Sequence, residues 1–482
     1  MSSFLLLYPV LSTPVVADDL LNPFSQTAEG GSSLPAALEY SWRGATAGAG
    51  FRIVGGAVGS AFNWLWLTVS ATFDVSLSTL YGLTKFVVLV ICAASIARFW
   101  WIASREYGRG IEYWDALVLT SLALFGTLQI HALWSNDPVT SYPIAGYGSA
   151  ALGFAVMSGA VLANRNETWR SYVVGAAVAT VAVLYYEINI GAVIGAAVIL
   201  SAGAWLQRSD RRKVALHLAR SAIFVGVPAV MVLYGRTVTG PRSNTYSGTQ
   251  VRTSGAIRAF LLGVGGVLPG AAWRLSIRAL GGRVPLVFFV FGLVLFLAWM
   301  LRWWAQSYRH LVSESVGHSR FARAALVFAT VGYGVFAITL QSITVKTQDE
   351  TRELGYVYTF YAIGSSVIAL GIAISIRSIS LRWSGAALRY LLCVFALGFI
   401  LVQSTVNWGL SEQLNRDYAV NRRLLDSFDQ DVQQVERCNA FAAWAVVPWP
   451  AYYRAGMRNG LQAAYQYYFH EPFCASLPAP RG

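Results

Sequence analysis

Long apolar runs with almost no charged residue recur along this sequence and constrain its fold more than any other feature. With their flanks, most of them reach the roughly 20 residues that an α-helix needs to cross the hydrocarbon core of a bilayer. Charged residues make up only 12% of the chain, against about a quarter in soluble domains. The sequence therefore predicts an all-α polytopic membrane protein. The runs cover residues 117–133, 173–184, 219–233, 284–301, 324–340, 358–376 and 390–402.

Lysine and arginine cluster at the ends of these runs, and this distribution predicts which connections lie in the cytoplasm. The short connections between the basic ones hold only Lys346 and Arg352. This alternation of basic and non-basic connections predicts about eleven helices, with the N-terminus inside and the C-terminus outside. It also accounts for the net charge of +13, so we expect a lipid bilayer and no nucleic acid as partner. The basic connections lie within residues 98–109, 165–170, 208–220, 302–323 and 377–389.

The first predicted helix, residues 3–16, is short for a membrane span. We interpret it as an uncleaved helix shortened by a late start codon, not as a signal peptide. Three segments on the predicted outer side are long: residues 18–80, residues 236–283 and the tail after Asn407. Their helical spacing of aromatic and small residues favours external amphipathic helices on the membrane surface, for example at residues 33–42 and 62–67, although ordinary packing helices fit equally well.

These segments predict a transmembrane module over residues 1–407 and an external C-terminal segment over residues 408–482. Cys438 and Cys474 both fall in that outer segment, in an oxidising compartment, so we predict a disulfide between them. Cys92 and Cys393 fall inside apolar helices, where a lone cysteine is usually a small buried residue. No residue pattern indicates a metal site or a cofactor, although a divalent metal stays open.

Two adjacent carboxylates, Asp18 and Asp19, directly follow the first apolar helix at its predicted outer end. Neighbouring carboxylates repel each other, and partial burial raises the pKa of at least one of them. This combination suits a general base or a cation ligand. A plain helix-end cap or stop fits the same pair, so that alternative stays open.

An aspartate pair at the end of the first helix, followed by a long outer segment, resembles the GT-C superfamily of integral membrane glycosyltransferases. Here the stretch reads Val-Val-Ala-Asp18-Asp19-Leu-Leu-Asn-Pro. The bacterial members related to serotype-converting glucosyltransferases look nearest. A second correspondence is the segment 236–283, between the seventh and eighth predicted helices. The resemblance covers about the first 300 residues, mainly as topology. It implies a GT-C-like bundle in the bacterial cytoplasmic membrane, with the active site on its periplasmic face.

The resemblance also implies a reaction: transfer of a sugar from a polyprenyl phosphate to a hydroxyl of a cell-envelope glycan or lipid-linked acceptor. Asp18 or Asp19 would accept the hydroxyl proton as general base. The departing phosphate needs positive charge, which arginine supplies with two oxygens bound at once. The candidates for this role are Arg236, Arg242, Arg252, Arg258, Lys346 and Arg352, and contact with lipid headgroups is the alternative for the arginines. The candidates for binding the sugar or the acceptor are His131, Asp137, Tyr186 and Glu187.

Two other function classes remain. A transporter or flippase for a lipid-linked glycan would need charges deep in helices that line a path, and the apolar runs carry almost none. An O-antigen-type polymerase or ligase would depend mainly on arginine and histidine of a large outer loop. Arginine substitutions within residues 236–283 would then abolish activity, whereas substitution of Asp18 would not.

Overall fold

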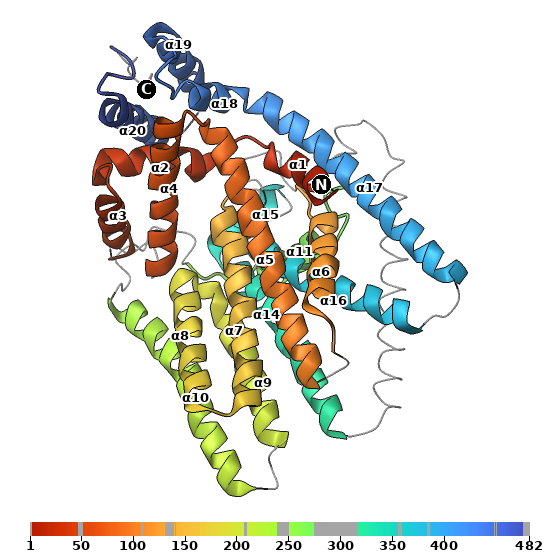
Figure 1. The fold of residues 1–482 in the computed structure, drawn as a ribbon. Helices are drawn as coiled ribbons and strands as arrows, with labels where there is room; N and C mark the ends of the chain where they lie inside the picture. Colours follow the sequence, from red (N-terminus) through yellow and green to blue (C-terminus); the bar gives the residue numbers. More distant parts are fainter. Residues whose placement is uncertain are drawn as a thin grey trace.

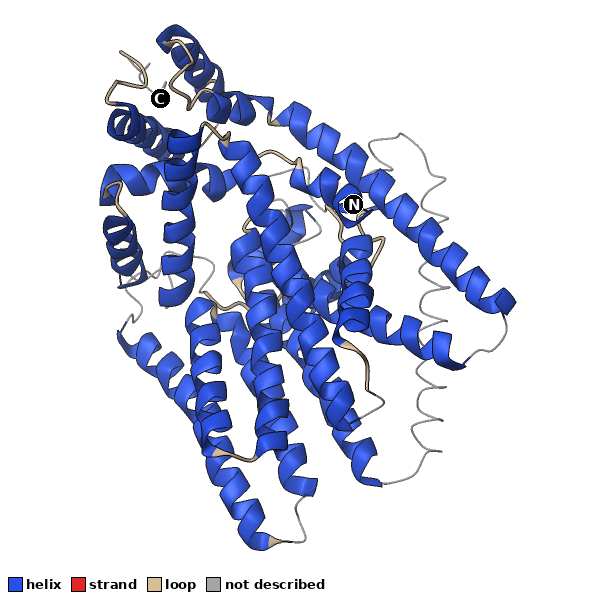
Figure 2. Ribbon diagram, in the orientation of Figure 1, coloured by secondary structure: helices blue, strands red, loops and turns tan. Residues whose placement is uncertain are grey.

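The structure is a computed structural model that describes residues 2–46, 52–107, 110–130, 139, 141–206, 210–238, 250–273, 317–354, 359–382, 386–447, 449 and 451–475. Within these residues the chain is nearly all helical and has no strands, apart from one isolated bridge between Val251 and Thr344 (Figure 2). The helices are α1 (Ser2–Leu11), α2 (Ala17–Gly30), α3 (Leu34–Thr46), α4 (Ile53–Phe73), α5 (Leu77–Tyr107), α6 (Tyr113–Thr127), α7 (Pro143–Asn166), α8 (Trp169–Tyr185), the 3₁₀ turn η1 (Glu187–Asn189), α9 (Ile190–Leu206), α10 (Arg211–Val238), α11 (Ala256–Val267), α14 (Gly317–Ser342), α15 (Val345–Leu354), α16 (Thr359–Arg382), α17 (Ala386–Asp417), α18 (Ala419–Asp426), α19 (Gln434–Ala445) and α20 (Ala451–Phe469).

Seven helical segments among the described residues are long and apolar enough to cross a membrane: α4, α5, α7, η1 with α9, α10, α14 and α16. This agrees with the predicted all-α polytopic class. The number of about eleven spans stays a prediction. The predicted run at residues 284–301 lies outside the described residues, whereas the runs at 173–184, 219–233, 324–340 and 390–402 lie within α8, α10, α14 and α17.

The predicted helix boundaries differ from the observed ones where prolines or extended residues interrupt the chain. The helix predicted over residues 3–16 ends at Leu11 as α1, because Pro14 lacks an N–H and disfavours helical geometry in the residue before it. The run at 117–133 ends at Thr127 as α6, and Leu128 is extended. The surface helix predicted at 62–67 is the middle of α4, which has 21 residues.

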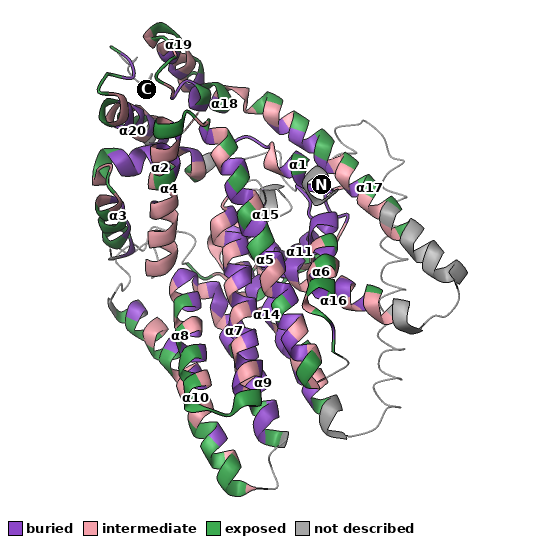
Figure 3. Ribbon diagram, in the orientation of Figure 1, coloured by how far each residue is buried: buried purple, intermediate pink, exposed green. Residues whose placement is uncertain are grey.

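The main core lies between α5, α7, α8, α9, α14 and α16, whose inward faces are buried (Figures 1 and 3). Small residues allow these helices to approach closely. A Cβ at Gly153 of α7 would clash with the phenol of Tyr333 in α14, and a Cβ at Gly175 of α8 would clash with the ring of Phe224 in α10. The packing of this core therefore depends on glycines at the helix crossings.

Several basic connections meet at one end of this bundle, here called the basic end. Nε of Arg323, near the start of α14, donates to the carbonyl of Tyr107 at the end of α5 over 2.8 Å. Nη2 of Arg377, near the end of α16, donates to the carbonyl of Gly110 over 2.7 Å. Connections that are far apart in the sequence thus gather as the alternation predicts, while the side of the membrane they face stays a prediction.

A second hydrophobic core joins the two ends of the chain. It combines residues of α2, α4 and the start of α5 with residues of α18, α19 and α20. Helix α2 lies across α4 (Figure 1) and meets α20 so closely that a Cβ at Gly460 would be 2.6 Å from the carbonyl oxygen of Phe24. The domain boundary predicted at residue 407 lies inside α17, and residues 18–80 share this second core with the C-terminal segment.

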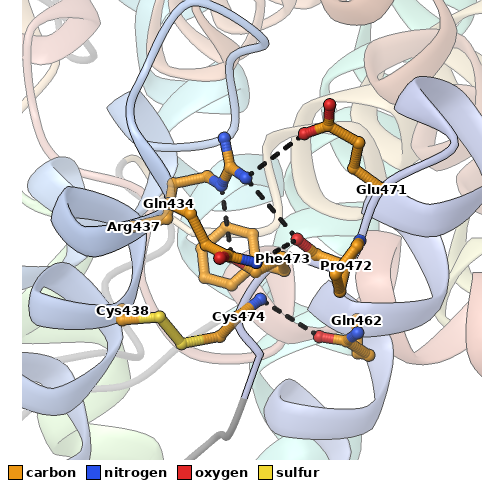
Figure 4. Close-up of a disulfide and its surroundings, with 8 residues drawn as sticks. All are labelled: Gln434, Arg437, Cys438, Gln462, Glu471, Pro472, Phe473 and Cys474. Carbon is orange, nitrogen blue, oxygen red and sulfur yellow. Dashed lines mark hydrogen bonds and ion pairs between the residues drawn. A yellow bond between two sulfur atoms is a disulfide. The ribbon is translucent and has the colours of Figure 1, made fainter.

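The predicted disulfide between Cys438 and Cys474 is present, with the two Cα atoms 5.4 Å apart (Figure 4). Beside it, the buried guanidinium of Arg437 donates from Nε to the carbonyl of Phe473 over 3.1 Å and lies 3.7 Å from the carboxylate of Glu471. These contacts hold the chain after α20 against α19. Cys92 is a free, buried thiol, as predicted.

Candidate functional site

Asp18 and Asp19 lie in the first turn of α2, after the non-helical residues 12–16, and therefore open a helix instead of closing α1. Val16, the residue before α2, is extended and supplies no side-chain cap. Negative charge is favourable near a helix N-terminus because the unpaired N–H groups there carry positive partial charge. The N-terminus of α2 is thus one influence that favours negative charge on the pair.

Donors from two other segments converge on this pair. The hydroxyl of Tyr81, in the first turns of α5, donates a short hydrogen bond to Oδ2 of Asp19. The backbone N–H of Tyr142 donates to the same oxygen over 2.6 Å, and the Tyr142 hydroxyl donates to Oδ2 of Asp18 over 2.8 Å. The described residues give Oδ1 of Asp19 no hydrogen-bond partner. Asp19 is therefore fixed through one oxygen while the other stays available.

Tyr142 reaches both carboxylates because its backbone is left-handed, with φ 53° and ψ 39°. This conformation is uncommon for a bulky residue, and the residue before a proline normally prefers extended geometry. Pro143 follows as the first residue of α7. Such a conformation costs about 1–3 kcal/mol and persists only where the surroundings hold it in place.

Lys85 lies one helical turn after Tyr81 on α5, and its side chain is fully buried. Its Nζ donates to Oγ1 of Thr13 over 2.6 Å and to the carbonyls of Val10 and Thr13, each over 3.4 Å. The same Nζ lies 4.7 Å from the centroid of the Tyr81 ring, within the range of a cation–π contact. A charged group inside a hydrophobic helix is costly and is a functional candidate by default.

The non-helical residues before α2 are held by side chains from the C-terminal part of the chain. Nδ2 of Asn415 in α17 donates to the carbonyl of Ser12 over 3.0 Å. Nδ2 of the buried Asn421 in α18 donates to the carbonyl of Val15 over 3.0 Å. A buried carbonyl outside regular structure needs such a partner, so these bonds fix the path by which the chain enters α2.

The two aspartates differ in environment. Asp18 is exposed, whereas Asp19 is only partly exposed. Removal of its carboxylate from water, assisted by the charge of Asp18, raises the pKa of Asp19 from 3.8 to about 6, against the opposing effects of Tyr81, the Tyr142 N–H and Lys85. A carboxylate with a pKa near neutrality can both accept and release a proton at physiological pH.

The pair lies far from the basic end. Tyr142 directly precedes α7, and Arg165 lies in the last turn of the same helix. A helix of 24 residues is about 36 Å long, somewhat more than the hydrocarbon core of a bilayer, which is about 30 Å thick. The acidic pair and the basic connections thus occupy opposite ends of a helix that is long enough to cross a membrane.

Glu187 and Tyr186, predicted to bind sugar or acceptor, are engaged by Arg52 at the start of α4. Arg52 donates from Nε and Nη2 to the two carboxylate oxygens of Glu187 over 2.7 and 2.8 Å. Its guanidinium carbon lies 4.0 Å from the centroid of the Tyr186 ring. These contacts join α4 to the turn between α8 and α9, and a sugar-binding role for the two residues stays a prediction.

The predicted phosphate-binding residues are only partly described. Arg252 lies 2.6 Å from Asp349 through Nη2 and donates from Nε to Gln348 over 2.7 Å, so the segment before α11 contacts α15. Arg258 is exposed on α11, and Lys346 is partly exposed on α15. Predicted residues whose side chains fall outside the described parts are Arg236 of α10, Arg242, Arg352 of α15, His131 and Asp137.

No group of three or more histidine, cysteine, aspartate or glutamate side chains in the described ranges could hold a metal ion. Three residues of the site were missed by sequence reasoning: Tyr81, Lys85 and Tyr142. The signal for Lys85 was present, because it is the only charged residue of α5 before Arg98. No sequence pattern distinguishes Tyr81 and Tyr142 from the many tyrosines of this chain.

The fold and the site together define a helical membrane protein of the multi-pass kind, with an acidic pair at one end of its bundle. No protein-family model, curated protein or solved structure matches this chain.

Proposed function

We propose that this chain is a membrane glycosyltransferase of the GT-C type. It would move a sugar from a polyprenyl-phosphate donor to a hydroxyl of a cell-envelope glycan or lipid-linked acceptor. The observation that carries this proposal is Asp19, a carboxylate fixed through Oδ2 by Tyr81 and the Tyr142 N–H, with Oδ1 available and a pKa of about 6. A general base is most effective when its pKa lies near the working pH.

In the proposed reaction, Oδ1 of Asp19 accepts the proton of the acceptor hydroxyl as its oxygen attacks the anomeric carbon. The bond between that carbon and the phosphate oxygen breaks, and polyprenyl phosphate leaves with the electron pair. Asp18 acts mainly by accepting the hydrogen bond of the Tyr142 hydroxyl, which holds the strained tyrosine in place. The negative charge of the leaving phosphate needs cationic partners, and the predicted arginines and Lys346 keep this role as part of the proposal.

The proposed location is the bacterial cytoplasmic membrane, with the site on the periplasmic face. Basic connections prefer the cytoplasmic side, and the acidic pair lies at the opposite end of α7 from Arg165. The second core, which includes the start of α5 beside the pair, contains the disulfide cysteine Cys474. A disulfide favours an oxidising compartment, which supports the same orientation.

The test is transfer of radiolabelled sugar from a panel of polyprenyl-phosphate donors by purified protein, with an envelope glycan fraction as acceptor. We expect Asp19→Asn to lower transfer by about 100-fold or more, because a positioned general base contributes about 10²–10⁴-fold. Asp18→Asn should lower it less. The matched control is Asp115→Asn, the same change at an exposed residue in the first turn of α6, which should leave transfer unchanged.

The same assay separates the other function classes. Full transfer by Asp19→Asn together with loss on Arg252→Ala or Arg258→Ala would point to the polymerase or ligase reading. No transfer from any donor, combined with movement of a lipid-linked glycan across proteoliposomes, would point to a transporter. Lys85 is a charge within an apolar helix, as a transporter would need, but its contacts with Thr13 and Val10 mark a packed position.

A further inference from the structure

We propose that the basic end carries a binding site for the phosphate of an anionic phospholipid, between the start of α8 and the first turns of α10. This inference goes beyond the proposed sugar transfer and does not depend on it. Three features of the two helices carry it: arginines without ion pairs, one arginine held against a tryptophan ring, and exposed valines that continue from the charges along both helices.

Helices α8 and α10 begin at the same end of the bundle and pack against each other (Figure 1). The hydroxyl of Tyr172 shares a hydrogen bond of 3.0 Å with Nδ1 of His217, and a Cβ at Gly175 would clash with the ring of Phe224. Trp169 begins α8 directly after the short turn that follows α7. The start of α8 therefore belongs to the basic end, and the first turns of α10 lie beside it.

Positive charge at this place is not neutralised within the protein. The carboxylates of Glu106 and Asp210 lie 3.9 and 4.0 Å from Arg165 and Lys213. The described residues give the other arginines of the two helix starts no ion pair. A cluster of basic side chains at the level of the membrane surface attracts anionic lipids. The arginines without an ion pair are Arg170 of α8 and Arg211, Arg212 and Arg220 of α10.

Arg220 is the centre of the proposed site, because two contacts hold its guanidinium in one orientation. Nη1 donates to the carbonyl of Glu167, and the guanidinium carbon lies 5.5 Å from the centroid of the Trp169 ring. Trp169 is 46% exposed, and tryptophan side chains prefer the level of the lipid headgroups. A planar guanidinium can bind two phosphate oxygens at once. An oriented arginine beside such a tryptophan therefore fits a lipid phosphate.

The apolar surface beside these charges favours a lipid over a soluble anion. Val173 and Val174 are exposed four residues after the tryptophan and the arginine that begin α8, so they lie on the same face of the helix. On α10, Val227 is exposed two turns after Arg220. A phospholipid places its phosphate and its acyl chains in this order, whereas inorganic phosphate or a nucleotide gains nothing from exposed valines.

The experiment is native mass spectrometry of the purified full chain in detergent, titrated with phosphatidylglycerol or with phosphatidylcholine. Wild type should retain phosphatidylglycerol at lower concentrations than phosphatidylcholine. Arg220→Gln should weaken the binding of phosphatidylglycerol about fivefold, which is the effect of one basic side chain near an anionic membrane surface. Arg220→Lys keeps the charge and should lose less. The control is Arg423→Gln, at an exposed arginine of α18, which should change nothing.

Photo-crosslinking tests the location of the bound lipid. Phosphatidylglycerol with a diazirine in its acyl chain should label the peptides that contain Val173, Val174 and Val227 in wild type. Arg220→Gln should lower this labelling, whereas labelling by the matching phosphatidylcholine probe should stay the same. A loss confined to the anionic probe distinguishes a phosphate-binding arginine from one that merely packs the two helices.

Equal retention of the two lipids by wild type, or phosphatidylglycerol binding unchanged in Arg220→Gln, would overturn the inference. Inorganic phosphate that displaces phosphatidylglycerol at equal concentration would assign the site to a soluble anion instead. If Arg220→Gln does not fold, the combined changes Arg170→Gln, Arg211→Gln and Arg212→Gln alter only exposed side chains. They should weaken binding about 100-fold, and unchanged binding there would equally refute the proposal. No arm needs sugar transfer, so the result stands apart from that of the transferase assay.

Discussion

Replacing Asp19 with asparagine should stabilise the folded chain at neutral pH even though it removes the proposed base. The reason is the direction of the pKa shift. The folded protein raises the pKa of Asp19 from 3.8 to about 6, so the folded state binds this proton more tightly than the unfolded state does. The stability that Asp19 contributes is therefore fully present below pH 3.8 and is lost as the pH rises through 6. Asparagine keeps a carbonyl oxygen for Tyr81 and Tyr142 but never ionises.

The magnitude follows from the size of the shift. A rise of about two pKa units corresponds to about 3 kcal/mol between the neutral and ionised forms. Asp19 is partly exposed, and screening by solvent reduces this figure to about 1–3 kcal/mol. Asp19→Asn should thus exceed wild type by this amount at pH 8, and the difference should vanish as the pH falls from about 6 to 3.8.

The assay is reversible unfolding of the purified protein in mixed micelles, repeated at several pH values between about 4 and 8. The control is Asp115→Asn, an exposed residue in the first turn of α6, which should gain no stability at pH 8. A variant of Asp19 that is less stable than wild type at pH 8, or whose advantage does not depend on pH, would refute the reasoning. Either result would mean that the ionised carboxylate is well compensated in the folded state.

Three further predictions concern the parts that hold the site. A Cβ at Gly460 would be 2.4 Å from the α2 backbone, so Gly460→Ala should lower the unfolding free energy by about 1–3 kcal/mol. The control is Gly409→Ala, where an added Cβ would meet nothing within 4 Å and should leave the stability unchanged or raise it in the same assay. Cys438→Ser opens a cross-link over 36 residues and should cost about 4 kcal/mol; wild type in reductant should match it, and unchanged stability would contradict the prediction. A double-mutant cycle with Arg52→Met and Glu187→Gln should give a coupling of about 1 kcal/mol in unfolding free energy, and no coupling would show that the bidentate contact is absent in solution.

Much of the fold could be predicted because the thickness of the bilayer sets the length of the apolar helices that cross it. The runs at 219–233 and 324–340 lie within α10 and α14, and the two tail cysteines are bonded. The residues at which individual helices end were harder to predict, although Pro14 indicated the end of α1. The sharing of one core by α2, α4 and the C-terminal helices depends on contacts between residues about 400 apart, for which a single sequence offers no pattern.

Of the candidate site, only the aspartate pair could be predicted from the sequence. Asp18 and Asp19 stand out because two carboxylates follow an apolar run, whereas Tyr142 and Tyr81 resemble any other tyrosine until the helices are assembled. Glu187 looked available because its connection is short and apolar, yet its partner Arg52 lies 135 residues earlier. Long-range partners decide which polar residues are engaged, and spacing along the chain does not report them.

Tyr142 offers the strongest argument that the acidic pair is functional and not a simple helix start. The described non-glycine residues with positive φ are Asp74, Glu167, His470 and Tyr142. The first three directly follow α4, α7 and α20, where a left-handed residue commonly ends a helix. Tyr142 precedes a helix and a proline, so neither position nor residue type favours its conformation. It donates to Asp18 and Asp19, and Asp19 is also bound by Tyr81, whose ring faces the buried Lys85. Backbone strain, a destabilised carboxylate and a buried cation thus coincide in one place, and such costs persist together where function requires the geometry.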